Sequence, residues 1–402
     1  MIPKPGFERL KSSPIANMAL ASKELFHSNF LAWVFSSYPT TVNSLLSAAN
    51  IDLCSPSSGL KVFREKYRLD LMIELGDGRI VVVENKLKSV PDSAQLKRYE
   101  EVAEKAAKVD PDRLNFILLT LSEKDWDYVP SGPDRWKRAD YGGLSRGLAS
   151  RLSAISDEYH RAIVHDYAGF VGALSGIANQ QAGDIWCRAA VGEDSGGDQS
   201  QEWLGTHKLD DLFGKRQGQL VASIVHEQLA DRFGDRILWQ QQPRDLGSMN
   251  VSVYSGFSNS QPLVGVFCAL ENLKCPDGET PVGIGFQVQG TQFRSYIEWP
   301  KPGRFAEAPK NGGRPTQAAE IASSLFEHPD CPRNFWVPRQ ESAGTKDQCR
   351  FGAEFHYRYT RVNPNRIRLD DLADQIVQRS KLLLTDLPLV EGILAGQVAK
   401  VR

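Results

Sequence analysis

Asp70, Glu84 and Lys86 are the residues of this sequence whose types and spacing are best suited to chemistry. Asp70 interrupts an otherwise apolar segment, and Glu84 ends the apolar run Ile80-Val81-Val82-Val83. Because side chains alternate between the two faces of a strand, Glu84 and Lys86 share one face. Charged groups at a buried strand end are costly unless they are paired or bound to a metal ion. Two carboxylates suit Mg²⁺ or Mn²⁺, and a neighbouring lysine can orient a water molecule or offset charge on a phosphate.

The sequence around these residues predicts a β-hairpin between helices. Two segments of strand composition, 61–75 and 79–86, are separated by Gly76-Asp77-Gly78, which is typical of a hairpin turn. The predicted elements, in chain order, are a helix over 23–35, this hairpin, a helix over 92–109, a strand over 114–120 and helices over 142–156 and 160–178. This order predicts an α/β fold in which a mixed sheet is flanked by helices.

A polar, glycine-rich stretch over 192–201 has no apolar periodicity and is typical of a linker. We therefore expect a first domain over 1–191 and a second domain over 202–402. Helices predicted over 209–233, 316–326 and 369–384, with several short strands between them, make the second domain a separate α+β unit. Its expected role is recognition, regulation or oligomerisation.

The order of these motifs carries a family resemblance. Asp70, followed by Glu84-Asn85-Lys86 at the end of an apolar strand, resembles the signature of the PD-(D/E)XK nuclease superfamily. Gln95 and Tyr99 resemble the Gln-x-x-x-Tyr element of its RecB-like branch, and His27 matches the metal-proximal histidine of that branch. The stretch from Glu24 to Trp33 is similar to a family of poorly characterised bacterial members, and the resemblance covers roughly residues 20 to 180.

The resemblance implies a restriction-endonuclease-like core and a role for each matching residue. Lys86 would be the catalytic lysine, and Gln95 and Tyr99 would position that lysine or the phosphate backbone. The implied metal ligands are Asp70, Glu84, the backbone carbonyl of Asn85, and Glu24 or His27 or both. The implied activity is Mg²⁺- or Mn²⁺-dependent hydrolysis of DNA in bacterial defence against phage.

Alternative interpretations of the same residues remain open from the sequence. Glu84 and Lys86 could form a salt bridge at a strand edge, and a single motif is only a hypothesis. His27 could be a packed helix histidine, and Glu24 could be a first-turn carboxylate favoured by the helix dipole. The alternative function is a non-cleaving module of nuclease fold that binds nucleic acid or a partner protein.

Composition limits the partners of the chain. Its 402 residues carry a net charge of −1, so any contact with nucleic acid must come from local patches, and an oligomer or a partner protein could gate the activity. One such patch is weakly indicated between Arg294 and Arg368, where 13 Lys/Arg stand against 8 Asp/Glu. Aromatic and basic residues interleave in this stretch in a mix that can stack bases, although the pattern slightly favours an ordinary core with a basic rim, and a regulatory or oligomerising domain is equally compatible. They are Tyr296, Trp299, Trp336, Phe355, Tyr357, Tyr359, Arg294, Arg358 and Arg361.

The same composition suggests a cellular location. The six cysteines are scattered, the first residues lack the apolar core of a signal peptide, and no apolar run approaches the roughly 20 residues of a membrane span. We therefore expect a cytoplasmic protein without membrane contact.

Overall fold

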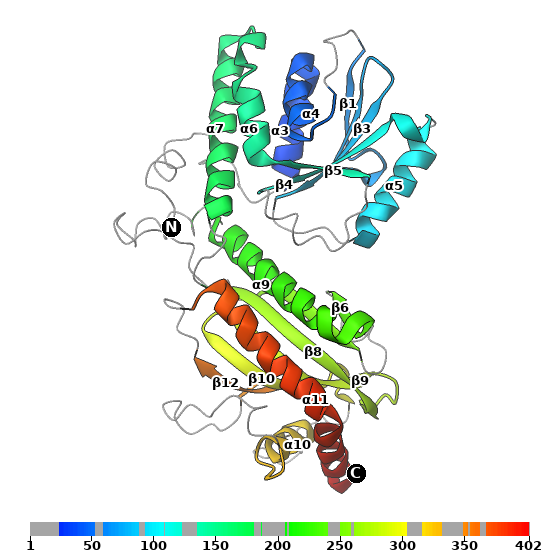
Figure 1. The fold of residues 1–402 in the computed structure, drawn as a ribbon, viewed down its shortest axis with the longest axis vertical. Helices are drawn as coiled ribbons and strands as arrows, with labels where there is room; N and C mark the ends of the chain where they lie inside the picture. The colour runs from blue at the N-terminus through cyan, green and yellow to red at the C-terminus, as the bar shows by residue number, and fades with distance from the viewer. Residues whose placement is uncertain are drawn as a thin grey trace, which may run out of the picture. The chain divides into compact units, whose positions relative to one another are not determined.

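The computed structural model divides the chain into two compact units (Figure 1). Unit 1 comprises Met1–Asp184 and Ala189–Arg216, and unit 2 comprises Ile185–Arg188 and Gln217–Arg402. The structure describes residues 24–52, 59–87, 93–107, 109–122, 135–180, 186, 206, 209–239, 250–258, 261–303, 316–331, 349–352, 354–361 and 367–401. The linker that the sequence predicts over 192–201 lies outside the described residues.

Unit 1 is built on a five-stranded mixed sheet, which confirms the predicted fold class. Its strands lie in the order β1 (Lys61–Arg64), β2 (Leu71–Glu74), β3 (Ile80–Lys86), β4 (Leu114–Thr120) and β5 (Trp136–Asp140). β2 pairs antiparallel with both β1 and β3, whereas β4 pairs parallel with both β3 and β5. The turn between β2 and β3 is the predicted hairpin, whereas the short and charged β5 has no strand signal in the sequence.

Helices cover both faces of this sheet (Figure 1). Val81 and Val83 of β3 belong to the core formed with α3 (Glu24–Ser37), α4 (Asn43–Ala48), α6 (Tyr141–Ala149) and α7 (Glu158–Gln180). Ile80 and Val82 belong to a smaller core with α5 (Ser93–Ala107). Because side chains alternate along β3, Glu84 and Lys86 lie on the α5 face, and Asn85 lies on the α3 face.

The single strand that composition predicts over 61–75 is divided in two. A 3₁₀ turn over Lys66–Arg68 separates β1 from β2, and Glu65, Tyr67 and Arg68 adopt positive φ values of 50°, 60° and 65°. Non-glycine residues seldom adopt this conformation, so composition gives no warning of it. The break places Asp70 in a bend immediately before β2.

Unit 2 is built on a seven-stranded sheet in the order β11-β12-β10-β9-β8-β7-β6. Its strands are β6 (Ile237–Trp239), β7 (Val251–Ser258), β8 (Gln261–Lys274), β9 (Pro281–Gln289), β10 (Gln292–Glu298), β11 (Cys349–Phe351) and β12 (Phe355–Arg361). All neighbouring strands pair antiparallel except β6 and β7.

Residues 217–233 of one long helix and two further helices contact the same face of the sheet. Trp239 contacts His226 of α9 (Leu209–Phe233), and the Arg379 guanidinium of α11 (Leu369–Val401) lies over the Phe293 ring. Arg358 donates to the carbonyl of Phe326 at the end of α10 (Gln317–Phe326). The strand registers put Trp239, Phe293 and Arg358 on one face, so the helices form a layer on that face.

Helix α11 is longer than the sequence predicts, and it is apolar enough to cross a membrane by length and composition. Its buried residues recur at helical spacing, as Leu383, Leu387, Val390 and Leu394 do. These residues pack within unit 2, whereas Leu382 and Leu389 of the same helix are exposed.

Candidate active site

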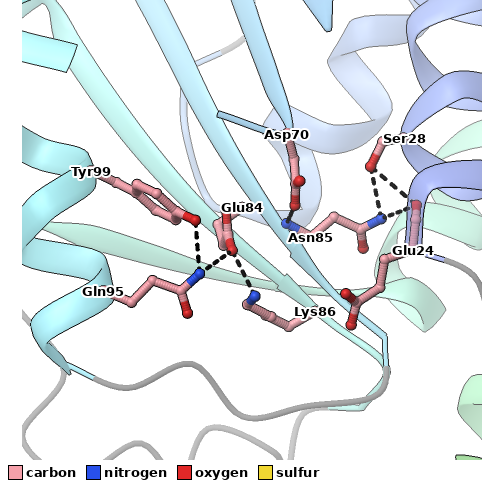
Figure 2. Close-up of polar contacts among 8 residues, drawn as sticks. All are labelled: Glu24, Ser28, Asp70, Glu84, Asn85, Lys86, Gln95 and Tyr99. Carbon is pink, nitrogen blue, oxygen red and sulfur yellow. Dashed lines mark hydrogen bonds and ion pairs between the residues drawn. The ribbon is translucent and has the colours of Figure 1, made fainter. Parts of the chain in front are cut away.

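Glu84 and Lys86 form an ion pair at the end of β3 (Figure 2). Lys86 Nζ lies 2.8 Å from Glu84 Oε1, and the two side chains are only 12% and 3% exposed. The alternation of side chains along the strand, which puts both on the α5 face, is what brings them together. Removing two charges from water is costly, so this ion pair differs from a salt bridge at the protein surface.

Helix α5 supports the pair from the same side (Figure 2). Gln95 Nε2 donates to Glu84 Oε1 at 3.2 Å and to the Tyr99 hydroxyl at 2.8 Å. Gln95 and Tyr99 are four residues apart, so they face the same direction on the helix. The structure thus joins both residues of the predicted Gln-x-x-x-Tyr element to Glu84.

Asp70 approaches the same strand end from the bend immediately before β2. Its Oδ2 accepts a 2.8 Å hydrogen bond from the backbone N–H of Asn85, which lies between Glu84 and Lys86. Burial raises the pKa of Asp70 above its usual value of 3.8, the Asn85 hydrogen bond and the charge of Lys86 oppose this, and the charges of Glu24 and Glu65 add to it.

The site concentrates negative charge where water is scarce. Burial and the charge of Asp70 raise the pKa of Glu84 to about 7, although the charge and hydrogen bond of Lys86 oppose them. Burial alone would lower the pKa of Lys86, but its pairing with Glu84 raises that pKa. Lys86 is therefore a cation at neutral pH, and a second cation beside the two carboxylates would relieve their mutual repulsion.

Glu24 joins the site from the first turn of α3. Its charge contributes to the pKa shifts of Asp70, Glu84 and Lys86, and its carboxylate points toward the Lys86 side chain (Figure 2). Its backbone carbonyl also accepts a 3.2 Å hydrogen bond from Asn85 Nδ2. The helix therefore brings a third carboxylate toward the strand end.

The side chain of Asn85 fixes the strand to the helices on the opposite face. It is fully buried, donates to Ser28 Oγ at 3.1 Å and accepts from the Tyr141 hydroxyl at 2.8 Å. The sequence predicted only a role for its backbone carbonyl, and it gave no signal for Ser28 or Tyr141. Both lie far from Asn85 along the chain, so no local spacing relates them.

All of these residues fall within one segment that is similar to a known family. Residues 15–168 match the model of the PD-(D/E)XK nuclease superfamily. The matching segment contains the whole sheet of unit 1 together with α3 to α6. No curated protein and no solved structure matches the chain.

His27, the histidine implied by the PD-(D/E)XK resemblance, lies on the other face of the sheet from Glu84 and Lys86. It is fully buried, and its Nδ1 lies 3.0 Å from the Tyr167 hydroxyl. The four rings around it belong to Phe26, Tyr141, Tyr167 and Phe170, with centroids between 5.2 and 6.0 Å away. These contacts account for His27 as a packing residue, and its role as a metal ligand stays a prediction.

The candidate site has the chemistry of a divalent cation site. Asp70, Glu84 and Glu24 offer hard carboxylate oxygens, the donors that Mg²⁺ and Mn²⁺ prefer. Within the part of the chain that the structure describes, no three His, Cys, Asp or Glu side chains form a metal-binding group. A cation here would therefore complete its shell with water or phosphate oxygens, as Mg²⁺ usually does.

Proposed function

We propose that unit 1 is a metal-dependent nuclease that hydrolyses phosphodiester bonds of DNA. The observation that carries this proposal is the nearly buried Lys86, held 2.8 Å from Glu84 beside Asp70 in the segment that matches nucleases. A lysine that only formed an ion pair at the surface would not need to be removed from solvent. Its partner Glu84 would not need a second donor from Gln95.

Each residue has a distinct role in this proposal. Asp70 and Glu84 would hold Mg²⁺ or Mn²⁺, together with the Asn85 carbonyl and the Glu24 carboxylate. The bound cation would supply a Lewis acid for the phosphate and a lower pKa for a water molecule. Lys86 orients the attacking water and offsets the negative charge that develops on the phosphate.

Gln95 and Tyr99 act on the site through Glu84. The amide of Gln95 donates to one carboxylate oxygen of Glu84 and is itself braced by the Tyr99 hydroxyl. This arrangement restricts the rotation of Glu84 and leaves its other oxygen available to a cation. Gln95 and Tyr99 are thus positioning residues in the proposal.

The DNA substrate and the defence role rest on the family resemblance. A bacterial enzyme of this kind would destroy phage DNA in the cytoplasm, a location compatible with free thiols at Cys268, Cys275, Cys331 and Cys349. The net charge of −1 favours activity that is gated by an oligomer or a partner protein over indiscriminate binding.

A cleavage assay tests the activity. The full chain is incubated with circular and linear duplex DNA, single-stranded DNA and RNA, each with Mg²⁺, with Mn²⁺ or with EDTA. We expect DNA cleavage that needs the metal and that Lys86→Ala abolishes, while Lys97→Ala, which removes an exposed lysine from α5, cleaves normally. Binding of nucleic acid without any cleavage would instead support a non-cleaving module of nuclease fold.

The defence role has its own test. Bacteria that produce the wild-type chain, Lys86→Ala or Lys97→Ala are infected with a panel of phages, and plaques are counted. Protection by the wild type and by Lys97→Ala, but not by Lys86→Ala, is the expected result. Equal plaque counts in all three strains across the panel would contradict the role.

A further inference from the structure

The sheet of unit 2 has a second face, opposite the layer of α9, α10 and α11. The strand registers place four tyrosines on it: Tyr254 on β7, Tyr296 on β10, and Tyr357 and Tyr359 on β12. Arg294 is on this face too, opposite Tyr359 on one side and Gln287 on the other. We call these residues, with Gln289, Gln292 and Arg361, the tyrosine–arginine face.

Glycines make room for the rings on this face. A Cβ added at Gly265 would lie 2.3 Å from the Tyr254 ring, and one added at Gly283 would lie 2.0 Å or less from the Phe267 ring. The rings of Tyr254 and Phe267 therefore lie over the glycine backbone of neighbouring strands, and Phe267 and Tyr296 are fully buried in a small core on this face. The partly exposed rings of Tyr357 and Tyr359, beside a fixed cation, suit a ligand that has planar rings and negative charge.

Arg294 is held rigidly by three glutamine side chains. Its Nε and Nη2 donate to Gln292 Oε1 at 2.9 and 2.7 Å, and its Nη1 donates to Gln287 and Gln289 at 2.9 and 2.6 Å. The guanidinium also lies 4.6 Å from the centre of the Tyr357 ring. Four of its five N–H groups are thereby used, and one on Nη2 is left over in the described part of the chain.

The charge of Arg294 has no carboxylate partner among the described residues. Its hydrogen-bond acceptors are all neutral amides, and burial lowers the pKa of the guanidinium. Burying a cation without a counter-charge is unfavourable, so an anionic ligand would stabilise this arrangement. Glu298 is the acidic residue on the same face, and it lies beyond Tyr296, opposite Phe355.

Two neighbours on β12 extend the face from Arg294. Tyr359 is half-buried, with its ring centre 6.3 Å from that of Tyr357. Arg361 is exposed and lies opposite Gln292, so a second cation follows Arg294 along the sheet. Arg358, which the sequence grouped with these residues, belongs to the helix-covered face. Trp299 follows the end of β10 and is fully buried, and Trp336 lies outside the described residues.

We infer that the tyrosine–arginine face of unit 2 binds single-stranded nucleic acid. Tyr357 and Tyr359 would stack on exposed bases, and Arg294 and Arg361 would contact the phosphates. Single strands are favoured over duplexes because only unpaired bases can lie flat on these rings. An acidic peptide would satisfy the arginines but would make no use of the tyrosines.

This face does not depend on the nuclease site of unit 1, so binding is measured without cleavage. The full chain is titrated into fluorescein-labelled dT20, rU20 and a 20-base-pair duplex in EDTA, and anisotropy is recorded at low and moderate salt. We expect both single strands to bind more tightly than the duplex, and the salt dependence to report the phosphate contacts. Lys97→Ala, which removes an exposed lysine from α5 of unit 1, should bind as the wild type does.

Variants of the face identify the contacts. Tyr359→Leu should weaken single-strand binding about tenfold, and Arg361→Gln should weaken it several-fold and reduce the salt dependence. Arg294→Lys should bind more weakly than wild type, because a lysine cannot hold the planar fork that the glutamines fix. The matched control is Arg350→Gln, which removes an exposed arginine on the opposite face of the same sheet and should bind normally.

Three results would overturn the inference. They are failure of both single strands to bind at low salt, equal affinities of Arg350→Gln and the tyrosine–arginine variants, and displacement of dT20 by polyglutamate at matched charge. Circular dichroism of each variant confirms that it is folded. Because EDTA is present throughout, loss of binding here is distinguishable from loss of catalysis in unit 1.

Discussion

The backbone N–H of Asn85 donates a 2.8 Å hydrogen bond to Oδ2 of Asp70, and this contact joins the two carboxylate-bearing segments of the site. Asn85 lies between Glu84 and Lys86, so Asp70 is fixed relative to both. The buried side chain of Asn85 is held in turn by Ser28 and Tyr141 from the other face of the sheet. The positions of the charged site residues thus depend on contacts of the Asn85 side chain, which is itself uncharged.

Substitution of His27, which lies on the opposite face of the sheet from Glu84 and Lys86, tests how strongly the fold depends on packing there. Truncation to His27→Ala removes a buried ring that packs among four others and contacts the Tyr167 hydroxyl. We expect the free energy of unfolding to fall by about 2–4 kcal/mol, the usual cost of emptying such a site. Urea denaturation followed by circular dichroism measures it.

The control for this variant is His165→Ala, which removes an exposed histidine from the same helix as Tyr167 and should change stability by less than about 0.5 kcal/mol. Metal-dependent cleavage by the folded fraction of His27→Ala should persist. Unchanged stability together with lost cleavage would instead make His27 a metal ligand, as the family resemblance implies.

The parts of the site that the sequence predicted follow from local periodicity. Glu84 and Lys86 share a face because strand side chains alternate, and Gln95 and Tyr99 share a face because they are four residues apart on a helix. Both relationships hold in the structure, where Gln95 bridges Tyr99 and Glu84. Such relationships require only a correct assignment of helix or strand.

The remaining features arise from tertiary contacts that local periodicity does not encode. The bend before Asp70 depends on Glu65, Tyr67 and Arg68 in a backbone conformation that their residue types disfavour. The apolar stripe of α3 does not reveal that Ser28 would face Asn85 or that His27 would face Tyr167. Composition likewise marks a basic, aromatic stretch in unit 2 without separating Arg294 from Arg358, which lie on opposite faces.

The packing of α6 on α4 requires a residue without a side chain at Gly147. A Cβ added there would lie 2.8 Å from Cα and 2.9 Å from the carbonyl oxygen of Ser44, and backbone atoms cannot move aside cheaply. Gly147→Ala should therefore destabilise unit 1 by about 1–3 kcal/mol, the usual cost of overpacking. The matched control is Gly176→Ala on α7, where nothing lies within 4 Å and better helix propensity should raise stability by about 0.5–1 kcal/mol. Thermal unfolding compares them, and equal melting temperatures would contradict the close contact.

Glu298 should make the stability of unit 2 depend on pH. Burial, followed by the charge of Glu354, raises its pKa in the folded chain from 4.5 to about 7. The folded state thus holds this proton more tightly than the unfolded state does, so stability falls as pH rises from about 4.5 to about 7. The loss is on the order of 3 kcal/mol at most, since each pKa unit corresponds to about 1.4 kcal/mol.

Removing the titrating carboxyl should flatten this dependence. Glu298→Gln keeps the size of the side chain but cannot ionise, so it should be more stable than wild type at pH 8 and similar to it at pH 4.5. Urea denaturation between these pH values measures the difference. The control is Glu320→Gln, an exposed carboxylate in the first turn of α10, which should leave the pH profile of the wild type intact. Parallel profiles for wild type and Glu298→Gln would show that Glu298 titrates normally.

Substitutions within the motif should separate metal ligands from the catalytic lysine. Asp70→Ala and Glu84→Ala each remove an oxygen donor, so they should weaken Mn²⁺ binding and abolish cleavage together. Lys86→Ala should also abolish cleavage, since loss of one transition-state contact typically costs about 10²–10³ in rate. It should nevertheless bind Mn²⁺ as tightly as wild type or more tightly, because it removes a positive charge a few ångströms from the cation. That repulsion is on the order of 1 kcal/mol or more at an effective dielectric constant near 20.

Calorimetric titration of Mn²⁺ into each folded variant, with cleavage measured in the same buffer, distinguishes these outcomes. Glu74→Ala is the matched control for the carboxylates, because Glu74 ends the neighbouring strand and pairs with Lys66 at 3.5 Å instead of with the site. It should bind Mn²⁺ and cleave as wild type does. Normal cleavage by Lys86→Ala would refute the role of the lysine, and unchanged Mn²⁺ binding by Glu84→Ala would refute the ligand assignment. If Lys86→Ala lost Mn²⁺ binding as well, the lysine would act by holding Glu84 in place, because the 2.8 Å contact between them would then be a requirement of the metal site.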